Sequence, residues 1–145
     1  MNVYFVIGPS CAGKSTYIQK NLPDAIKIDL YDFQKDSNVT IENIVKSYED
    51  CKNALIEAVK TGKDVVLEHT MLMSKRRPPY IEAVRQNCDC KLICIVLKPS
   101  ARKLQNRQKK RYEYRPDITH AKEMLNILEI PSKDEGFDEI IIIED

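Results

Sequence analysis

The stretch Gly8-Pro9-Ser10-Cys11-Ala12-Gly13-Lys14-Ser15 constrains this chain most, because it fits the spacing G-x-x-x-x-G-K-[ST] without a departure. Residues 3–7 before it are β-branched and aromatic and predict a strand, and residues 16–22 predict a short helix that ends at Pro23. Between a strand and a helix, successive backbone N–H groups of such a loop form a nest for anions. The stretch therefore predicts a site for the phosphates of a nucleoside triphosphate.

Each part of this loop has an expected task in nucleotide binding. All residues from Gly8 to Thr16 are expected to contact the nucleotide, for which ATP is the first choice. Lys14 would reach the β- and γ-phosphates, and the Ser15 hydroxyl would hold Mg²⁺. ATP and Mg²⁺ are thus the expected donor substrate and cofactor.

Length, charge and cysteine usage narrow the class of protein. The chain has 145 residues and a formal net charge of +1, so we expect one domain with no global field that would draw it onto nucleic acid. Five cysteines without a C-x-x-C pair, and only two histidines, argue against structural zinc and favour a reduced, cytoplasmic setting. Met1 leads directly into the first strand, and no apolar run approaches the ~20 residues of a membrane span. Neither a signal peptide nor membrane association is expected.

Strands and helices are expected to alternate along the whole chain. A helix over 40–61 is predicted from Thr40 as N-cap, Gly62 as stop and one buried apolar stripe that includes Ile41, Ile44, Val45, Cys51 and Leu55. Further strands are predicted at 25–28, 65–67, 92–97 and 140–143, with 92–97 buried on both faces and 140–143 a buried strand. Further helices are predicted at 80–87, 101–111 and 116–130. This alternation predicts a parallel sheet between two layers of helices.

Acidic residues stand where two of the expected strands end. Asp29 directly follows the second strand, Asp32 lies three residues later, and Glu68 ends a short apolar run. Ligands of open parallel sheets bind at the carboxyl ends of the strands, so we expect at least one aspartate to face an acceptor and Glu68 to lie near Mg²⁺. A cap, a turn or ordinary strand-end polarity is the alternative. Thr70 is a further substrate-binding candidate, and His69 is expected to pack or hydrogen-bond rather than act as a base.

Two basic segments are candidate phosphate binders. Between 102 and 115 seven side chains are basic, and Arg107 and Arg111, four residues apart, share one helical face. A planar guanidinium suits the oxygens of a transferred phosphoryl group, so we interpret this segment as a lid rather than a solvated face. Lys75, Arg76 and Arg77 form the second segment, which either binds a substrate phosphate or is simply exposed.

This layout resembles the P-loop kinases, and most closely the kinase domain of polynucleotide 5′-hydroxyl kinases, with the zeta toxins and small-molecule phosphotransferases as near neighbours. The resemblance covers nearly the whole chain. Glu68-His69-Thr70 followed by Lys75-Arg76-Arg77 is similar to the polynucleotide-kinase pattern of acid-Thr-x-x-x-x-x-Arg-Arg, and segment 104–111 to that family's paired lid arginines. The resemblance implies a three-layer α/β P-loop NTPase fold, with a five-stranded parallel sheet of order 2-3-1-4-5. Residues 1–145 would form one kinase domain with an arginine-rich lid around 102–116.

The turn after the second strand departs from that family's pattern. Without gaps, Tyr31 stands where the family has its catalytic aspartate, and Gln34 stands where it has an arginine. A shift of one residue would bring Asp32 to the catalytic position, whereas Asp29 would need a larger move. We therefore predict Asp32 as the base that orients the acceptor hydroxyl and Asp29 as its positioning partner.

The predicted activity is transfer of the γ-phosphoryl group of ATP to a hydroxyl. The first choice of acceptor is a polynucleotide 5′-hydroxyl. A small molecule such as a nucleotide-sugar, sugar or antibiotic, and an NTP-binding module or slow NTPase without transfer, stay open as alternatives. The candidate catalytic residues are Lys14, Asp29, Asp32, Arg107 and Arg111, and the candidate substrate-binding residues are Asp29, Asp32, Thr70, Arg76 and Arg77.

Overall fold

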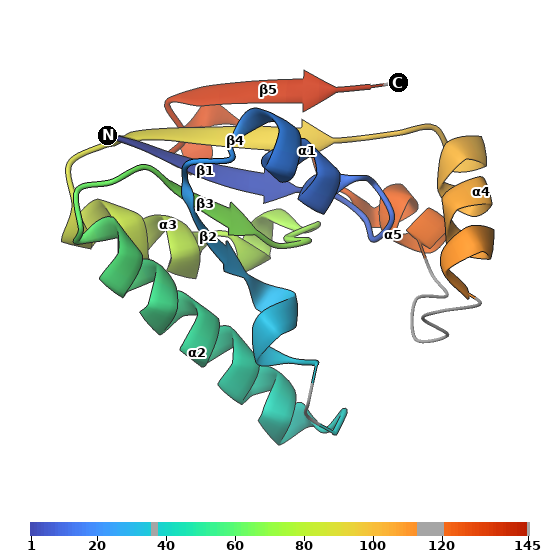
Figure 1. The fold of residues 1–145 in the computed structure, drawn as a ribbon, viewed down its shortest axis with the longest axis horizontal. Helices are drawn as coiled ribbons and strands as arrows, with labels where there is room; N and C mark the ends of the chain where they lie inside the picture. The colour runs from blue at the N-terminus through green and yellow to red at the C-terminus, as the bar shows by residue number, and fades with distance from the viewer. Residues whose placement is uncertain (36–37, 113–120, 145) are drawn as a thin grey trace.

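Five parallel strands form the central layer of the computed structural model, which describes residues 1–35, 38–112 and 121–144, with the side chains of 111 and 112 left out. The sheet has the order β2-β3-β1-β4-β5, which confirms the predicted fold class and strand order (Figure 1). The strands are β1 (Asn2–Ile7), β2 (Ile26–Asp29), β3 (Val65–Glu68), β4 (Lys91–Leu97) and β5 (Glu139–Ile143).

Helices cover both faces of this sheet. Phe5 of β1 packs on one side with residues of α2 and α3, and Val6 packs on the other side with residues of α1, α4 and α5. Both residues are 0% exposed, so β1 is the centre of the fold and its C-terminal end lies between the two layers of helices. The helices are α1 (Lys14–Asn21), α2 (Ile41–Val59), α3 (Pro78–Asn87), α4 (Ala101–Tyr112) and α5 (Ala121–Ile127), with 3₁₀ turns η1 (Leu30–Phe33), η2 (Ser74–Arg76) and η3 (Lys133–Glu135).

Helix α2 begins as predicted but is only partly buried. The Thr40 hydroxyl accepts a hydrogen bond from the Asn43 N–H at 3.1 Å, which confirms the N-cap. The prediction of one buried stripe is wrong for the first two turns, where Ile41 is 84% and Val45 60% exposed, while Leu55 is 0% exposed. The reason is that this end of the helix extends beyond the edge of the sheet (Figure 1).

Strand β5 was predicted to be a buried strand, and this is wrong as well, since none of its residues is fully buried. It pairs with β4 on one side only, as the last strand of the described sheet. Ile141 and Ile142 are 37% and 44% exposed, because the outer edge of a sheet receives less cover from the helices. Strand β4, between β1 and β5, is buried from Leu92 to Leu97 as expected.

The described residues bear on two further features, a membrane span and the predicted lid. No helix among the described residues is both long enough and apolar enough to cross a membrane. Part of the predicted lid, residues 113–116, lies outside the described residues, and so does the predicted start of the last helix. The described part of the lid is helix α4.

Candidate active site

The phosphate loop joins β1 to α1, and two of its residues, Gly8 and Cys11, have unusual backbone conformations. Gly8 has φ +147°, and a Cβ atom there would lie 2.5 Å from the carbonyl oxygen of Leu97, so only glycine fits this position. The Gly8 N–H donates to the Thr70 carbonyl at 3.3 Å, which ties the loop to the segment after β3. Cys11 has φ +67°, a left-handed conformation that is unfavourable for a residue with a side chain.

Lys14 lies inside the loop and is only 9% exposed. Its Nζ donates to the carbonyl oxygens of Gly8 and Pro9, both at 2.9 Å. The Ser10 N–H donates to Met124 Sδ at 3.4 Å, so a methionine of α5 lies against the mouth of the loop. The ammonium group is therefore held at the position from which a lysine of this motif reaches nucleotide phosphates.

Ser15 and Glu68 form the second part of the site. The Ser15 hydroxyl contacts both carboxylate oxygens of Glu68, at 2.8 and 2.9 Å, across the carboxyl edge of the sheet. A hydroxyl and a carboxylate are hard oxygen ligands of the kind that Mg²⁺ takes, together with water and substrate phosphates. Since this ion needs only one or two protein groups beside a nucleotide, the pair fits Mg²⁺, and Ser15 and Glu68 are the residues that would hold it.

Asp29 lies directly beside Glu68, because β2 and β3 are paired in a register that sets these two residues opposite each other. The Asp29 carboxylate caps η1 by accepting a hydrogen bond from the Tyr31 N–H at 3.0 Å. Lys27 Nζ lies 3.8 Å from Asp29 and 3.5 Å from Glu68. Burial, followed by the charge of Glu68, raises the pKa of Asp29 above its ordinary value. Two carboxylates and one ammonium thus stand together at the end of the sheet.

Asp32 does not join this group. Its carboxylate pairs with Lys35 at 3.7 Å, and its side chain is 59% exposed on the outside of η1. The prediction that ranked Asp32 above Asp29 does not fit this arrangement, since the strand register brings Asp29 to Glu68 and the η1 turn directs Asp32 to solvent. Tyr31, at the family's usual catalytic position, is 41% exposed.

Arg107 reaches the loop from α4, as the lid interpretation requires. Its Nη1 donates to the carbonyl oxygens of Cys11 and Ala12 at 3.3 and 3.1 Å. Beside it lies a cavity of about 560 Å³ that is bounded by the loop, α1, α4 and the end of β5. This cavity has the size and place for the base and ribose of a nucleotide whose phosphates lie in the loop. Arg111 belongs to the same helix, and its side chain lies outside the described residues.

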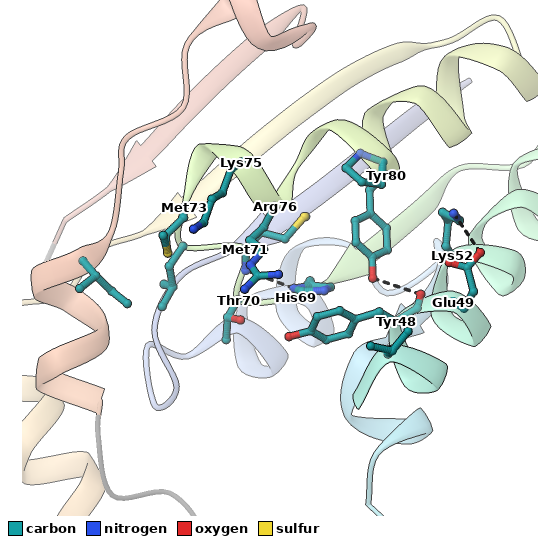
Figure 2. Close-up of a pocket in the computed structure, with 14 residues that line it drawn as sticks. Tyr48, Glu49, Lys52, His69, Thr70, Met71, Met73, Lys75, Arg76 and Tyr80 are labelled. Atoms are coloured by element: carbon teal, nitrogen blue, oxygen red, sulfur yellow. Dashed lines mark hydrogen bonds and ion pairs between the residues drawn. The ribbon is translucent and has the colours of Figure 1, made fainter. Parts of the chain in front are cut away.

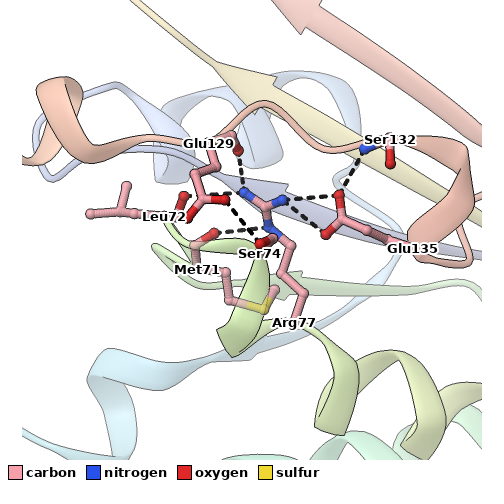
Figure 3. Close-up of polar contacts among 7 residues, drawn as sticks. All are labelled: Met71, Leu72, Ser74, Arg77, Glu129, Ser132 and Glu135. Atoms are coloured by element: carbon pink, nitrogen blue, oxygen red, sulfur yellow. Dashed lines mark hydrogen bonds and ion pairs between the residues drawn. The ribbon is translucent and has the colours of Figure 1, made fainter.

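Arg77 was predicted to bind substrate, and its surroundings contradict this. It is 0% exposed, and its guanidinium donates to both carboxylate oxygens of Glu135 at 2.9 and 3.2 Å and to Met71 O at 3.1 Å (Figure 3). Its remaining donors bind the carbonyl oxygens of Leu72, at 3.2 Å, and of Glu129. All five N–H groups are used inside the protein, so Arg77 joins the segment after β3 to the segment after α5.

Arg76 and Thr70, by contrast, line a cavity of about 400 Å³ on the other side of the loop (Figure 2). Its walls come from α2, the segment after β3, the start of α3 and the last residue of α5. Sequence reasoning missed this cavity, since its parts are far apart in the chain. One signal in the sequence was His69, a polar residue directly after the apolar strand and its terminal Glu68. The lining residues are Val45, Tyr48, Glu49, Lys52, His69, Thr70, Met71, Leu72, Met73, Lys75, Arg76, Pro79, Tyr80 and Ile127.

Comparison with known proteins identifies relatives of this arrangement. A family model described as an AAA domain matches residues 3–126. No curated protein sequence matches the chain. Among solved structures, a candidate kinase of Chloroflexus aurantiacus is similar with a TM-score of 0.77 at 13% identity, over 99% of this chain and 84% of that one.

Two further structures share the fold. The Pnkp1/Rnl/Hen1 RNA repair complex contains a chain with a TM-score of 0.64 at 15% identity, over 86% of this chain and 44% of that chain. The APS kinase CysC of Mycobacterium tuberculosis, solved with AMPPNP and APS, has a TM-score of 0.64 at 14% identity, over 97% of this chain and 87% of that one. At such identities the matches establish the P-loop kinase fold and leave the acceptor open.

Proposed function

This chain belongs to the AAA domain family, and on that premise we propose that it is an ATP-dependent kinase that transfers a γ-phosphoryl group to a hydroxyl. The observation that carries the proposal is the hydrogen bond from Ser15 to Glu68 beside the phosphate loop. A hydroxyl of the loop and a strand-end carboxylate in contact are the protein ligands that a nucleotide-bound Mg²⁺ requires. Residues 1–145 would form one kinase domain.

The donor would bind with its phosphates in the loop and its base in the cavity beside α4. Lys14 would exchange the Gly8 and Pro9 carbonyls for phosphate oxygens. Ser15 and Glu68 would hold Mg²⁺, which when bound neutralises charge on the phosphates. Arg107 would turn from Cys11 and Ala12 toward the transferred group, and Arg111 would act from the same helix face.

The acceptor hydroxyl would approach from the other side of the loop, where Asp29 stands. The Asp29 carboxylate would accept a hydrogen bond from the hydroxyl and orient its oxygen toward the γ-phosphorus. The first choice of acceptor is the 5′-hydroxyl of a nucleic acid, with Thr70 and Arg76 as residues that contact it. A small-molecule hydroxyl is the second choice, supported by the limited volume of the cavity, about 400 Å³.

Incubation with γ-labelled ATP and Mg²⁺ tests this proposal, with 5′-hydroxyl oligonucleotides, nucleotide-sugars and free sugars as acceptors. Label on one acceptor class is the expected result. Lys14→Ala should abolish the transfer while weakening ATP binding less, and Lys63→Ala, a change of an exposed lysine, should leave both unchanged. Free phosphate as the only labelled product would favour a slow NTPase, and transfer by Lys14→Ala within a few-fold of wild type would exclude the loop as the active site.

A further inference from the structure

His69 has a buried ring nitrogen that no described residue satisfies. The side chain is 5% exposed and lines the 400 Å³ cavity, and its Nδ1 accepts a hydrogen bond from the Met71 N–H at 3.1 Å. Since Nδ1 is the acceptor, the ring proton of the neutral imidazole is on Nε2. Nε2 makes no hydrogen bond with the described residues, although a buried N–H without a partner costs free energy. A ligand atom that accepts a hydrogen bond would remove this cost.

The structural role of His69 is complete without Nε2. Met71 has φ +36°, an unfavourable backbone conformation for a side chain of this size, and the hydrogen bond from its N–H to Nδ1 stabilises the turn. Because Nδ1 accepts a hydrogen bond from the Met71 N–H, it carries no proton, and the ring is neutral in this arrangement. The ring therefore offers the cavity one neutral donor, the Nε2–H group.

Aromatic and apolar side chains form most of the cavity wall. The His69 ring lies 5.5 Å from the Tyr48 ring and 5.0 Å from the Tyr80 ring, measured between centroids (Figure 2). Such a wall suits a flat ring with polar atoms on its edge, because the faces of the ring pack on apolar groups. A free sugar would bury several hydroxyls without partners on the same wall. The apolar and aromatic lining residues are Val45, Tyr48, Met71, Leu72, Met73, Pro79, Tyr80 and Ile127.

Positive charge gathers on one rim of the cavity. Lys75 and Arg76 of η2 are exposed, and their side chains form no hydrogen bond or ion pair with the described residues. Lys52 on the opposite wall pairs with Glu49 at 3.1 Å. The two cations of η2 are thus available to an anionic group of the ligand, and a phosphate suits a lysine beside an arginine.

The inner end of the cavity adjoins the phosphate loop. His69 follows Glu68 directly, and the carbonyl of Thr70, another lining residue, accepts a hydrogen bond from the Gly8 N–H at 3.3 Å. A ligand in the cavity would therefore present its innermost group to the site where the γ-phosphate of ATP is expected.

We propose that this cavity binds a phosphorylated nucleoside as the acceptor, an inference that rests on the proposed kinase function. The base lies against Tyr48 and Tyr80, an acceptor atom on its edge binds His69 Nε2–H, and its phosphate binds Lys75 and Arg76. The free ribose hydroxyl points to the phosphate loop. Its oxygen forms a bond to the γ-phosphorus while the bond from that phosphorus to the β,γ-bridging oxygen breaks. ADP leaves with the electron pair, and the hydroxyl proton passes to the Asp29 carboxylate and on to solvent.

Calorimetric titration with adenosine 3′-monophosphate and cytidine 3′-monophosphate tests the inference without any turnover. At least one nucleotide should bind, and gluconate and inorganic phosphate should bind far more weakly. Lys75→Ala should weaken the binding of the nucleotide and leave the binding of unphosphorylated adenosine unaffected. Lys63→Ala, at an exposed lysine of the turn after α2, should change neither affinity.

Two variants of His69 separate ligand binding from structure. In His69→Asn the side-chain oxygen can still accept from the Met71 N–H, but no donor reaches the position of Nε2. In His69→Gln the amide nitrogen can stand near that position, while the acceptor for Met71 is lost. We expect His69→Asn to weaken nucleotide binding about 3- to 10-fold at nearly wild-type melting temperature. His69→Gln should bind the nucleotide more tightly than His69→Asn does, although its melting temperature should be lower. The reverse order of affinities would mean that His69 serves structure alone and would overturn its assignment.

The same titrations distinguish this inference from the kinase proposal. If neither nucleotide binds at millimolar concentration while a non-hydrolysable ATP analogue does, the acceptor inference is wrong and the kinase proposal is unaffected. If the ATP analogue fails to bind as well, both are wrong. Competition by a 5′-hydroxyl trinucleotide would identify a nucleic-acid end as the source of the nucleoside, and competition only by a uridine diphosphate sugar would identify a nucleotide-sugar. Either result supports the site.

Discussion

The hydroxyl of Ser15 lies 2.8 and 2.9 Å from the two carboxylate oxygens of Glu68, although 53 positions separate the two residues in the chain. The contact exists because β1 and β3 are parallel neighbours, with Val6 of β1 opposite Glu68. The loop that follows β1 therefore begins α1 directly beside the end of β3. A carboxylate and a hydroxyl meet at the place where the phosphates of a nucleotide and their Mg²⁺ are expected.

Removing either partner should impair catalysis through the metal. We expect Ser15→Ala and Glu68→Gln each to raise the Mg²⁺ concentration for half-maximal transfer at least about 10-fold, since even outer-shell changes cost 10–100-fold in metal affinity. Titration of the initial rate with MgCl₂ measures this. Binding of ATP in EDTA should change little in Ser15→Ala, so an equal loss of ATP affinity with and without Mg²⁺ would contradict the assignment.

Arg76 and Arg77 are neighbours in the chain and should respond in opposite ways to the same substitution. Arg77→Ala leaves the carboxylate of Glu135 and three backbone carbonyls without their buried donor, so we expect a loss of roughly 3–5 kcal/mol in the free energy of unfolding. Arg76→Ala changes an exposed side chain and should alter stability by less than about 0.5 kcal/mol. Urea unfolding of both variants measures the difference, and similar midpoints would show that Arg77 is not the structural residue of the pair.

The sequence predicts the frame of this site better than its details. The phosphate loop, the strand-end position of Glu68 and the lid helix with Arg107 follow from local patterns, because glycine spacing and strand ends are properties of short segments. The burial of Arg77 and the exposure of Arg76 do not follow from a sequence pattern. Which one turns inward depends on how η2 leads into α3 and on Glu135, which lies 58 residues further along the chain than Arg77.

The cavity beside the loop could not be predicted for the same reason. Tyr48, His69, Tyr80 and Ile127 come from separate segments, and only the folded chain brings them together. The exposed apolar start of α2 also becomes understandable from the fold, since Val45 lines this cavity. A pattern read as a buried stripe was partly the wall of a cavity that is open to a ligand.

Arg107 should stabilise the transition state of the reaction and contribute little to the stability of the fold. Its contacts with the Cys11 and Ala12 carbonyls bring it to the loop, and an arginine that meets the transferred group contributes about 10³–10⁵ in rate. We expect Arg107→Ala to lower kcat by that order at an unchanged melting temperature. Arg107→Lys should recover little, because the planar fork is lost. Arg111→Ala should behave similarly. Wild-type kcat in both alanine variants would show that the basic face of α4 is solvated and has no part in catalysis.

Cys11 offers a test of strain in the loop. Its φ of +67° is unfavourable for any residue with a Cβ atom and costs glycine nothing. Cys11→Gly should therefore raise the free energy of unfolding by roughly 1 kcal/mol, set against the greater freedom of glycine in the unfolded chain. Transfer should persist, because the residue contributes only backbone to the loop. A lower melting temperature would show that the buried Cys11 side chain contributes more by packing than the strain costs.

Either Asp29 or Asp32 could supply the carboxylate that orients the acceptor, and the strand register favours Asp29. It stands opposite Glu68, whereas Asp32 pairs with Lys35 in solvent, so Asp29→Asn should lower kcat by about 10²–10⁴ and Asp32→Asn by only a few-fold. The pKa of Asp29 is raised, so its carboxylate takes up a proton at a higher pH than an ordinary aspartate does. A protonated Asp29 cannot accept the hydrogen bond of the acceptor, so the wild-type rate should fall on acidification already above the ordinary pKa of 3.8.

The same raised pKa ties the role of Asp29 in catalysis to a cost in stability. The folded state holds the proton more tightly than the unfolded state, so stability is fully present below the unfolded pKa and decreases as pH rises through the folded pKa. At neutral pH the ionised Asp29 opposes folding through burial and the charge of Glu68, and Asp29→Asn should melt at a higher temperature than wild type while losing transfer. Asp32→Asn is the matched control: it should leave the melting temperature nearly unchanged and lower transfer by no more than a few-fold. If Asp32→Asn loses transfer and Asp29→Asn keeps it, the one-residue shift of the turn is correct and the acceptor approaches over η1.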